Sequence, residues 1–271
     1  MLVDTHAHLW WDSYKGDLEE VLARARKAGV EKIICPGTNV TTSRQAIGLA
    51  KKYPGMIYAA AGVHPEELQS SDHSGASLPA GRQGSELGKL IAENREQVVA
   101  VGEIGIDLNT EELREKLPEQ RELFRAQCEL AMNNNLPVII HTRQSLRETF
   151  EVLDQLPKIP RGVFHCFSHD EEGVKEVLSR GFYISFGGNI TWSKRVARLV
   201  EMIPRERLLL ETDSPLLVPR DQKGVPVEGS ERNEPANVRI LAQIIAERRD
   251  VDLAELARQT TNNAEQLFGI S

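Results

Sequence analysis

The sequence contains little cysteine and no long apolar run, and these two absences exclude whole classes of protein. Its three cysteines, Cys35, Cys128 and Cys166, form no C-x-x-C pair. An odd number of scattered cysteines argues against a disulfide framework and for a reducing compartment. No apolar stretch approaches the roughly 18 residues that a membrane-spanning helix requires. The opening residues, Met-Leu-Val-Asp, lack the basic start of a secretory signal, so we expect a cytoplasmic protein with no membrane partner.

Positive charge is also scarce. The chain has 33 Lys and Arg against 40 Asp and Glu, which gives a net charge of −7. Proteins that hold nucleic acid nonspecifically over a broad face usually carry the opposite balance. A substrate rich in phosphate would therefore have to be held at one concentrated point, by a local cluster of basic groups or by bound cations. Nothing in the composition requires an obligate protein partner.

What the sequence does contain is a regular alternation of β-rich and amphipathic segments. The expected strands are 2–9, 32–38, 57–64, 98–107, 137–142, 162–167, 183–188 and 208–213. The expected helices include 18–28, 120–133, 145–156, 171–180 and 194–203, with a closing pair at 235–248 and 252–267. Eight such units in 271 residues, with no shift in composition, predict one α/β domain over 1–271, a (β/α)₈ TIM barrel. An open doubly wound sheet is the alternative, because alternation alone does not show closure.

One segment breaks the regular pattern. Residues 70–85 (SSDHSGASLPAGRQGS) are rich in Ser, Gly and Pro and show no apolar period. This composition is typical of a flexible surface loop, here between the third strand and its helix. The loop is either a tolerated insertion, which costs a folded domain little, or a lid on the substrate side.

Histidines gather at the predicted strand ends. Five of the seven lie there, and a carboxylate ends each of two further strands. These side chains are His6, His8, His64, Glu103, His141, His165 and Asp213. In parallel α/β folds the active site collects at the carboxyl ends of the strands, so we expect these residues to converge.

The His6-Ala7-His8 pair indicates a metal site, although an isolated H-x-H is often accidental. Residues two apart on a strand point the same way, so both imidazoles can reach one ion. Adding Glu103, His141, His165 and Asp213 makes six ligands, too many for one tetrahedral zinc. Six ligands suit two divalent ions bridged by a carboxylate. Mixed nitrogen and oxygen ligation suits zinc, manganese or iron, while magnesium, which prefers oxygen, is a further candidate.

Three further side chains are candidates for binding the substrate. His64 either orients a phosphate or is a structural histidine at the top of the barrel. Arg143, two residues beyond His141, either binds an anion or is solvated in a loop. Arg232, just before a predicted helix, either clamps a phosphate or caps structure. Cys166 follows His165 directly, so by alternation we expect a buried thiol facing the helices.

Seven motifs, in order over nearly the whole chain, resemble those of the TatD family, a branch of the amidohydrolase-like metal-dependent hydrolases. They are Asp4-Thr5-His6-Ala7-His8, Gly62-Val63-His64-Pro65, Gly102-Glu103-Ile104-Gly105-Ile106-Asp107, His141-Thr142-Arg143, Phe164-His165-Cys166-Phe167-Ser168, Glu211-Thr212-Asp213-Ser214-Pro215 and Arg232-Asn233-Glu234-Pro235. The resemblance extends to Thr261-Asn262-Asn263-Ala264 near the C-terminus.

The resemblance implies a TIM barrel, divalent-metal-dependent hydrolysis and deoxyribonuclease activity, often as a 3′→5′ exonuclease. Carried over by position, one ion would be held by His6, His8, Glu103 and Asp213. The other would be held by Glu103, His141 and His165, with Glu103 as the bridge. Asp213 and Glu103 would then be the catalytic residues, Asp213 orienting the attacking water and accepting its proton.

Four positions near these motifs depart from the residues usual in the family. Trp10 stands where an aspartate is frequent, Leu108 where a tyrosine is, Gln144 where an acid is, and His169 where glycine is usual. None is an implied ligand, so the departures bear on substrate preference and on the rim of the pocket.

We therefore expect a deoxyribonuclease that cleaves phosphodiester bonds through a metal-activated water, with DNA, single-stranded or at 3′ ends, as its partner. Two other functions stay open. The same metal pair would polarise the carbonyl of a small amide, ester or lactone. A barrel that binds metal without catalysis, as a partner for nucleic acid or protein, is the third.

Overall fold

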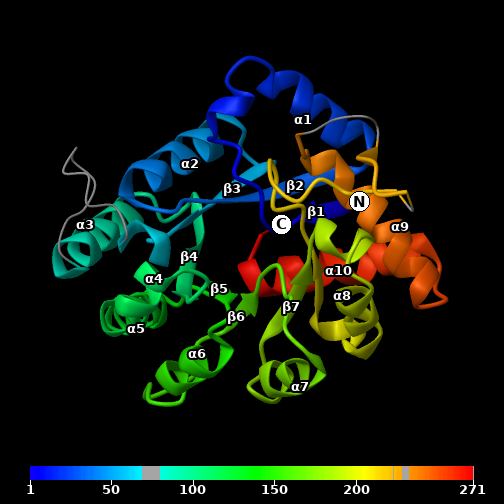
Figure 1. The fold of residues 1–271 in the computed structure, drawn as a ribbon. Helices are drawn as coiled ribbons and strands as arrows, with labels where there is room; N and C mark the ends of the chain where they lie inside the picture. The colour runs from blue at the N-terminus through cyan, green and yellow to red at the C-terminus, as the bar shows by residue number, and fades with distance from the viewer. Residues whose placement is uncertain (69–79, 222, 228–231, 271) are drawn as a thin grey trace.

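The computed structural model describes residues 1–68, 80–221, 223–227 and 232–270, which form a parallel eight-stranded sheet surrounded by helices (Figure 1). The strands are β1 (Leu2–Asp4), β2 (Val30–Pro36), β3 (Ile57–Ala61), β4 (Val98–Asp107), β5 (Val138–Arg143), β6 (Gly162–Phe164), β7 (Tyr183–Phe186) and β8 (Leu208–Leu210). They follow one another around the sheet in sequence order, and every neighbouring pair is parallel.

The sheet closes where the end of β1 meets the end of β8. The amide of Thr5 donates to the carbonyl of Leu210 at 3.0 Å. The buried carboxylate of Asp4 accepts hydrogen bonds from the amide and hydroxyl of Thr212, at 3.0 and 2.6 Å, and from the amide of His6 at 3.2 Å. Because the first and last strands are tied together, the predicted TIM barrel is confirmed and the open sheet is excluded.

Helices pack around the strands of the barrel (Figure 1). They are α1 (Leu18–Lys27), α2 (Val40–Lys52), α3 (Ala80–Glu93), α4 (Glu111–Glu115), α5 (Leu117–Asn133), α6 (Leu146–Leu153), α7 (Glu171–Ser179), α8 (Lys194–Leu199), α9 (Val238–Arg248) and α10 (Leu253–Phe268). In α1 the apolar residues Val21, Leu22 and Ala25 share one buried face, as their spacing predicts. Among the described helices none is both long enough and apolar enough to cross a membrane.

Alternation along the strands gives the barrel an outer and an inner apolar layer. Ile33 of β2 packs in the outer layer beneath the helices, whereas Ile34 belongs to the inner cluster. The C-terminal end of α10 packs on this inner cluster through Leu267 and Phe268. Its Glu265 also pairs with Lys32, near the start of β2, at 2.7 Å. Helix α10 therefore closes the end of the barrel where the strands begin, and the functional groups collect at the other end.

Several strands are shorter than the sequence predicts. β1, β6 and β8 end at Asp4, Phe164 and Leu210, and not at residues 9, 167 and 213. Beyond β6 and β8 the chain turns, because Cys166 and Asp213 adopt left-handed backbone with φ of 46° and 56°. The functional side chains past these strands consequently lie on loops, where strict strand alternation no longer holds.

The predicted flexible insertion, residues 70–85, falls only partly within the described chain. Helix α3 begins at Ala80, so residues 80–85 are helical and do not belong to a loop. Residues 70–79 lie outside the described residues.

We expect Asp4→Ala to lower the free energy of unfolding by about 2–4 kcal/mol, because three buried donors would lose their acceptor. The measurement is urea-induced unfolding followed by circular dichroism. Asp12→Ala is the matched control, since the Asp12 side chain is 87% exposed in a surface ion pair and should matter by less than about 1 kcal/mol. Equal stability of the two variants would contradict the closing role of Asp4.

Candidate metal centre

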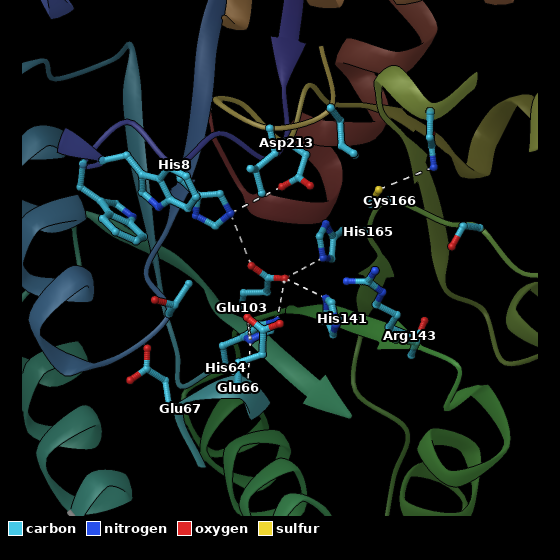
Figure 2. A pocket seen from close by; sticks show the side chains of 18 residues that line it. His8, His64, Glu66, Glu67, Glu103, His141, Arg143, His165, Cys166 and Asp213 are labelled. Atoms are coloured by element: carbon cyan, nitrogen blue, oxygen red, sulfur yellow. Dashed lines mark hydrogen bonds and ion pairs between the residues drawn. The ribbon is translucent and has the colours of Figure 1, made fainter. Parts of the chain in front are cut away.

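The six side chains predicted as metal ligands come together at the carboxyl ends of the strands. Figure 2 shows five of them, His8, Glu103, His141, His165 and Asp213. His6 and His8 follow β1, Glu103 lies on β4, His141 on β5, His165 follows β6 and Asp213 follows β8. All are buried except His141, which is partly exposed. Together with His64 they form overlapping groups whose potential ligand atoms lie within 4.8 Å of one another. Residues distant in the sequence thus form one compact cluster.

Glu103 lies at the centre of this cluster, on a part of β4 where two glycines face β5 with no room for a side chain. A Cβ on Gly105 would lie 1.9 Å from the carbonyl oxygen of His141, and the φ of Gly105 is +153°. A Cβ on Gly102 would lie 2.6 Å from the Cβ of Ile139. Only glycine fits at these two positions, so the Gly102-Glu103-Ile104-Gly105 motif brings the Glu103 carboxylate to the mouth of the barrel.

The two oxygens of Glu103 face different sets of imidazoles. Oε2 lies 3.3 Å from Nε2 of His6 and 3.6 Å from Nε2 of His8. Oε1 lies 2.8 Å from Nε2 of His165 and 3.1 Å from Nδ1 of His141. The Glu103 carboxylate thus presents one oxygen to each of two groups of imidazoles.

The donor atoms on the Oε2 side of Glu103 fit a small divalent ion. Nε2 of His6 and Nε2 of His8 are 3.2 Å apart, and they lie 3.6 and 3.5 Å from Oδ1 of Asp213. Ligands about 2.0–2.1 Å from a tetrahedral ion are separated by about 3.3–3.5 Å. Two nitrogens and two carboxylate oxygens at such distances fit a divalent metal ion.

Burial and mutual attraction shift the pKa values in the cluster. Burial opposes ionisation of Glu103, yet His165, His64 and His6 hold its pKa well below the usual range. Burial lowers the pKa of His6, and its neighbour His165 lowers it further. Burial also disfavours charge on His141, but its hydrogen bonds to Asp107 and Glu103 raise the pKa to about 8. The buried carboxylates thus attract positive charge, which a bound divalent cation would supply.

Two further carboxylates support the cluster from behind, and the sequence analysis did not assign them. Oδ2 of Asp107 lies 2.9 Å from Nε2 of His141, on the side of the ring away from Glu103. Oε1 of Glu211 lies 3.5 Å from Nδ1 of His165 and accepts a hydrogen bond from the amide of Cys166 at 2.6 Å. Both carboxylates fix the orientation of a ligand imidazole, a common arrangement around metal sites. Each is an acidic residue within a motif that the sequence analysis lists, and that position was the available signal for a role beside the metal site.

The candidate substrate-binding residues divide into two that reach the cluster and one that does not. Nε2 of His64 lies 3.4 Å from Oε1 of Glu103, and Arg143 lines the cavity beside the cluster (Figure 2). Arg232 lies elsewhere. Asp17 pairs with its guanidinium at 2.6 Å, and Glu234 pairs with it at 3.2 Å. The structure therefore places Arg232 in an ion-pair network beside the start of α1 and before α9, and it does not line this cavity. Its role as a phosphate clamp stays a prediction.

The cavity above the cluster has a volume of about 440 Å³ and walls of two kinds. Trp10, Trp11 and Leu216 contribute apolar surface, and Glu66 contributes an acidic group at the rim. Cys166 also lines the cavity, contrary to the expectation that its thiol faces the helices. The left-handed backbone at Cys166 explains the difference, because it interrupts the alternation of the strand.

Comparison with known proteins gives consistent matches over the full length of the chain. The sequence model of a family described as TatD related DNase matches residues 3–269. A Bacillus subtilis protein named uncharacterized metal-dependent hydrolase YabD is 37% identical over 274 residues, which cover 100% of both chains. An Erwinia tasmaniensis protein named 3′-5′ ssDNA/RNA exonuclease TatD is 36% identical, over 99% of this chain and 100% of its own.

Among solved structures, YjjV, a TatD homolog from Escherichia coli K12, is 30% identical and superposes with a TM-score of 0.86 over 100% of this chain and 98% of its own. A TatD-family hydrolase from Entamoeba histolytica, 26% identical, gives a TM-score of 0.84 over 100% of this chain and 98% of its own. Family, fold and ligand cluster agree: the chain belongs to the TatD family of metal-dependent hydrolases.

Proposed function

We propose that this enzyme is a deoxyribonuclease that removes nucleotides from the 3′ ends of single-stranded DNA. In this proposal the cluster holds two divalent ions. The observation that carries the proposal is the division of the imidazoles between the two oxygens of Glu103. The names of relatives such as the Erwinia tasmaniensis exonuclease support the substrate class.

The ligands are divided between two ions in this proposal. His6, His8, Glu103 and Asp213 would hold one, and Glu103, His141 and His165 the other. Zinc and manganese fit the mixed nitrogen and oxygen donors, and magnesium is the third candidate. When bound, the ions lower the pKa of a coordinated water and offset charge on the phosphoryl oxygens.

The side chains of the cavity have separate tasks. Burial opposes ionisation of Asp213, but its contact with His8 lowers the pKa. In this proposal the carboxylate of Asp213 orients the attacking water and accepts its proton. His64 and Arg143 lie where they would orient the scissile phosphate. Because the whole chain carries a net charge of −7, we expect attraction for the phosphates to be concentrated in the cavity above the cluster, called the cup below. A single chain end that enters the cup fits this charge distribution better than a duplex that lies across a negatively charged protein.

A second candidate function is hydrolysis of a small amide, ester or lactone. The apolar wall of the cavity favours it, because Trp10, Trp11 and Leu216 would suit an apolar acyl group as well. Side-by-side assays of oligonucleotides and of a panel of amides, esters and lactones separate the two functions.

Asp213→Asn should lower kcat/KM for single-stranded DNA by about 10²–10⁴-fold, because the amide cannot accept the proton of the water. Steady-state hydrolysis of a labelled oligonucleotide measures this, with circular dichroism to show that the variant is folded. Asp12→Asn, an exposed carboxylate outside the cavity, is the matched control. Wild-type rates in Asp213→Asn would refute the role of Asp213.

Metal analysis of the purified protein should give two divalent ions per chain after reconstitution. His8→Ala and His141→Ala should each lose one ion and keep the other, because each residue belongs to a different set of ligands. Inductively coupled plasma mass spectrometry after gel filtration measures the stoichiometry. A single ion in the wild type, or the loss of both ions in both variants, would contradict the division of ligands.

Chelation should abolish turnover, and readdition of divalent ions should restore it. With a 5′-labelled single-stranded oligonucleotide, restored enzyme should give a ladder that shortens one nucleotide at a time, because the chain enters the cup by its 3′ end. Cleavage that begins within the strand, or that releases the 5′ label first as a mononucleotide, would be evidence against this polarity.

A further inference from the structure

Two adjacent tryptophans form one wall of the cavity, shortly after a candidate metal ligand. Trp10 and Trp11 are separated from His8 by Leu9, and both side chains line the cavity while also packing on the hydrophobic core. Trp192, the third tryptophan of the chain, is 43% exposed and does not line the cavity. The aromatic surface at the cup is therefore local and comes from one short segment.

A side-chain hydrogen bond holds the indole of Trp10, and backbone hydrogen bonds hold the segment that carries Trp11. Nε1 of Trp10 donates a hydrogen bond to the carbonyl of Pro36 at 2.7 Å. The amide of Trp11 donates to the carbonyl of His8 at 3.2 Å, and its carbonyl accepts from the amide of Tyr14 at 3.0 Å. The ring centroids of the two tryptophans lie 6.1 Å apart. A partly buried, hydrogen-bonded aromatic wall loses little freedom when a flat ligand lies on it.

The wall is oriented toward the cluster. The ring of Trp11 is inclined by only 29° to that of His8, with the centroids 6.2 Å apart. His8 in turn lies 3.5 Å from Asp213 through its Nε2. Polar groups occupy other parts of the cavity lining, among them His64 and Arg143 (Figure 2). The site thus places a flat apolar surface next to a centre suited to phosphate. A nucleotide matches both, because it carries a flat base and a phosphate on the same sugar.

We infer that Trp11, supported by Trp10, is a stacking platform for the base of the terminal nucleotide; this rests on the proposed nuclease function. A base within a duplex is already stacked and paired, so only an unpaired terminal base is free to lie on the indole. Stacking on an aromatic ring also tolerates every base. The platform therefore gives the enzyme a preference for single-stranded ends without a preference for sequence.

The test compares two single-stranded oligonucleotides that differ only in the 3′-terminal residue, which carries either thymine or no base. The measured quantity is discrimination, the ratio of kcat/KM for the two substrates. Trp11→Ala should reduce this ratio by about 5- to 150-fold, which corresponds to the loss of one base–aromatic stacking contact. Trp11→Phe should keep most of it, because the phenyl ring still offers a flat face.

Trp192→Ala is the matched control, since it removes a tryptophan outside the cavity, and its discrimination should equal that of the wild type. If Trp11→Ala discriminates as the wild type does, the platform is overturned. If Trp11→Ala slows both substrates equally, Trp11 acts on the structure of the cup, and the platform is overturned as well.

A binding experiment separates failure of the platform from failure of the nuclease proposal. Each oligonucleotide carries a non-hydrolysable methylenephosphonate at its 3′-terminal linkage, and fluorescence anisotropy measures the affinity of each metal-loaded protein for the two oligonucleotides. Tighter binding of the thymine-bearing end by the wild type, lost in Trp11→Ala, supports the platform. If the hydrolysis assay then shows no cleavage of either oligonucleotide, only the nuclease proposal fails. Equal affinity of the wild type for both ends overturns the platform, whatever the result of the hydrolysis assay.

Discussion

The arrangement of the site depends on one buried carboxylate that contacts two sets of imidazoles. Glu103 presents Oε2 to His6 and His8, and Oε1 to His141 and His165. Placing a negative charge at the mouth of an apolar barrel is costly unless positive charge surrounds it. The imidazoles supply that compensation in the protein alone, and divalent ions would supply it in the loaded enzyme. Removing Glu103 would leave both sets of imidazoles without their common partner.

The barrel makes this position possible through backbone contacts. Glycine is required at 102 and 105, where a side chain would collide with β5, and Glu103 between them lies at the mouth of the barrel. Asp4 ties the end of β1 to the loop after β8, which fixes His6 in relation to Asp213. Stability and function are therefore linked: the contacts that close the barrel also set the distances between ligands that are some 200 residues apart in the sequence.

Much of this architecture could be predicted from the sequence, because periodicity reports which faces are buried. The strand at 98–107 has its predicted bounds, and the six candidate ligands lie close together as the strand ends suggested. Predictions that relied on strand alternation past the true strand ends were less accurate. Cys166 lines the cavity because its backbone is left-handed, which no side-chain pattern reveals. Arg232 is bound by Asp17, a partner 215 residues away that only the fold brings near.

Anomalous diffraction from crystals soaked in manganese or zinc tests the central claim most directly. The account predicts two peaks about 3.5–4 Å apart, with the carboxylate of Glu103 between them and a different group of histidines around each. A single peak, or two peaks that do not share Glu103, would contradict it.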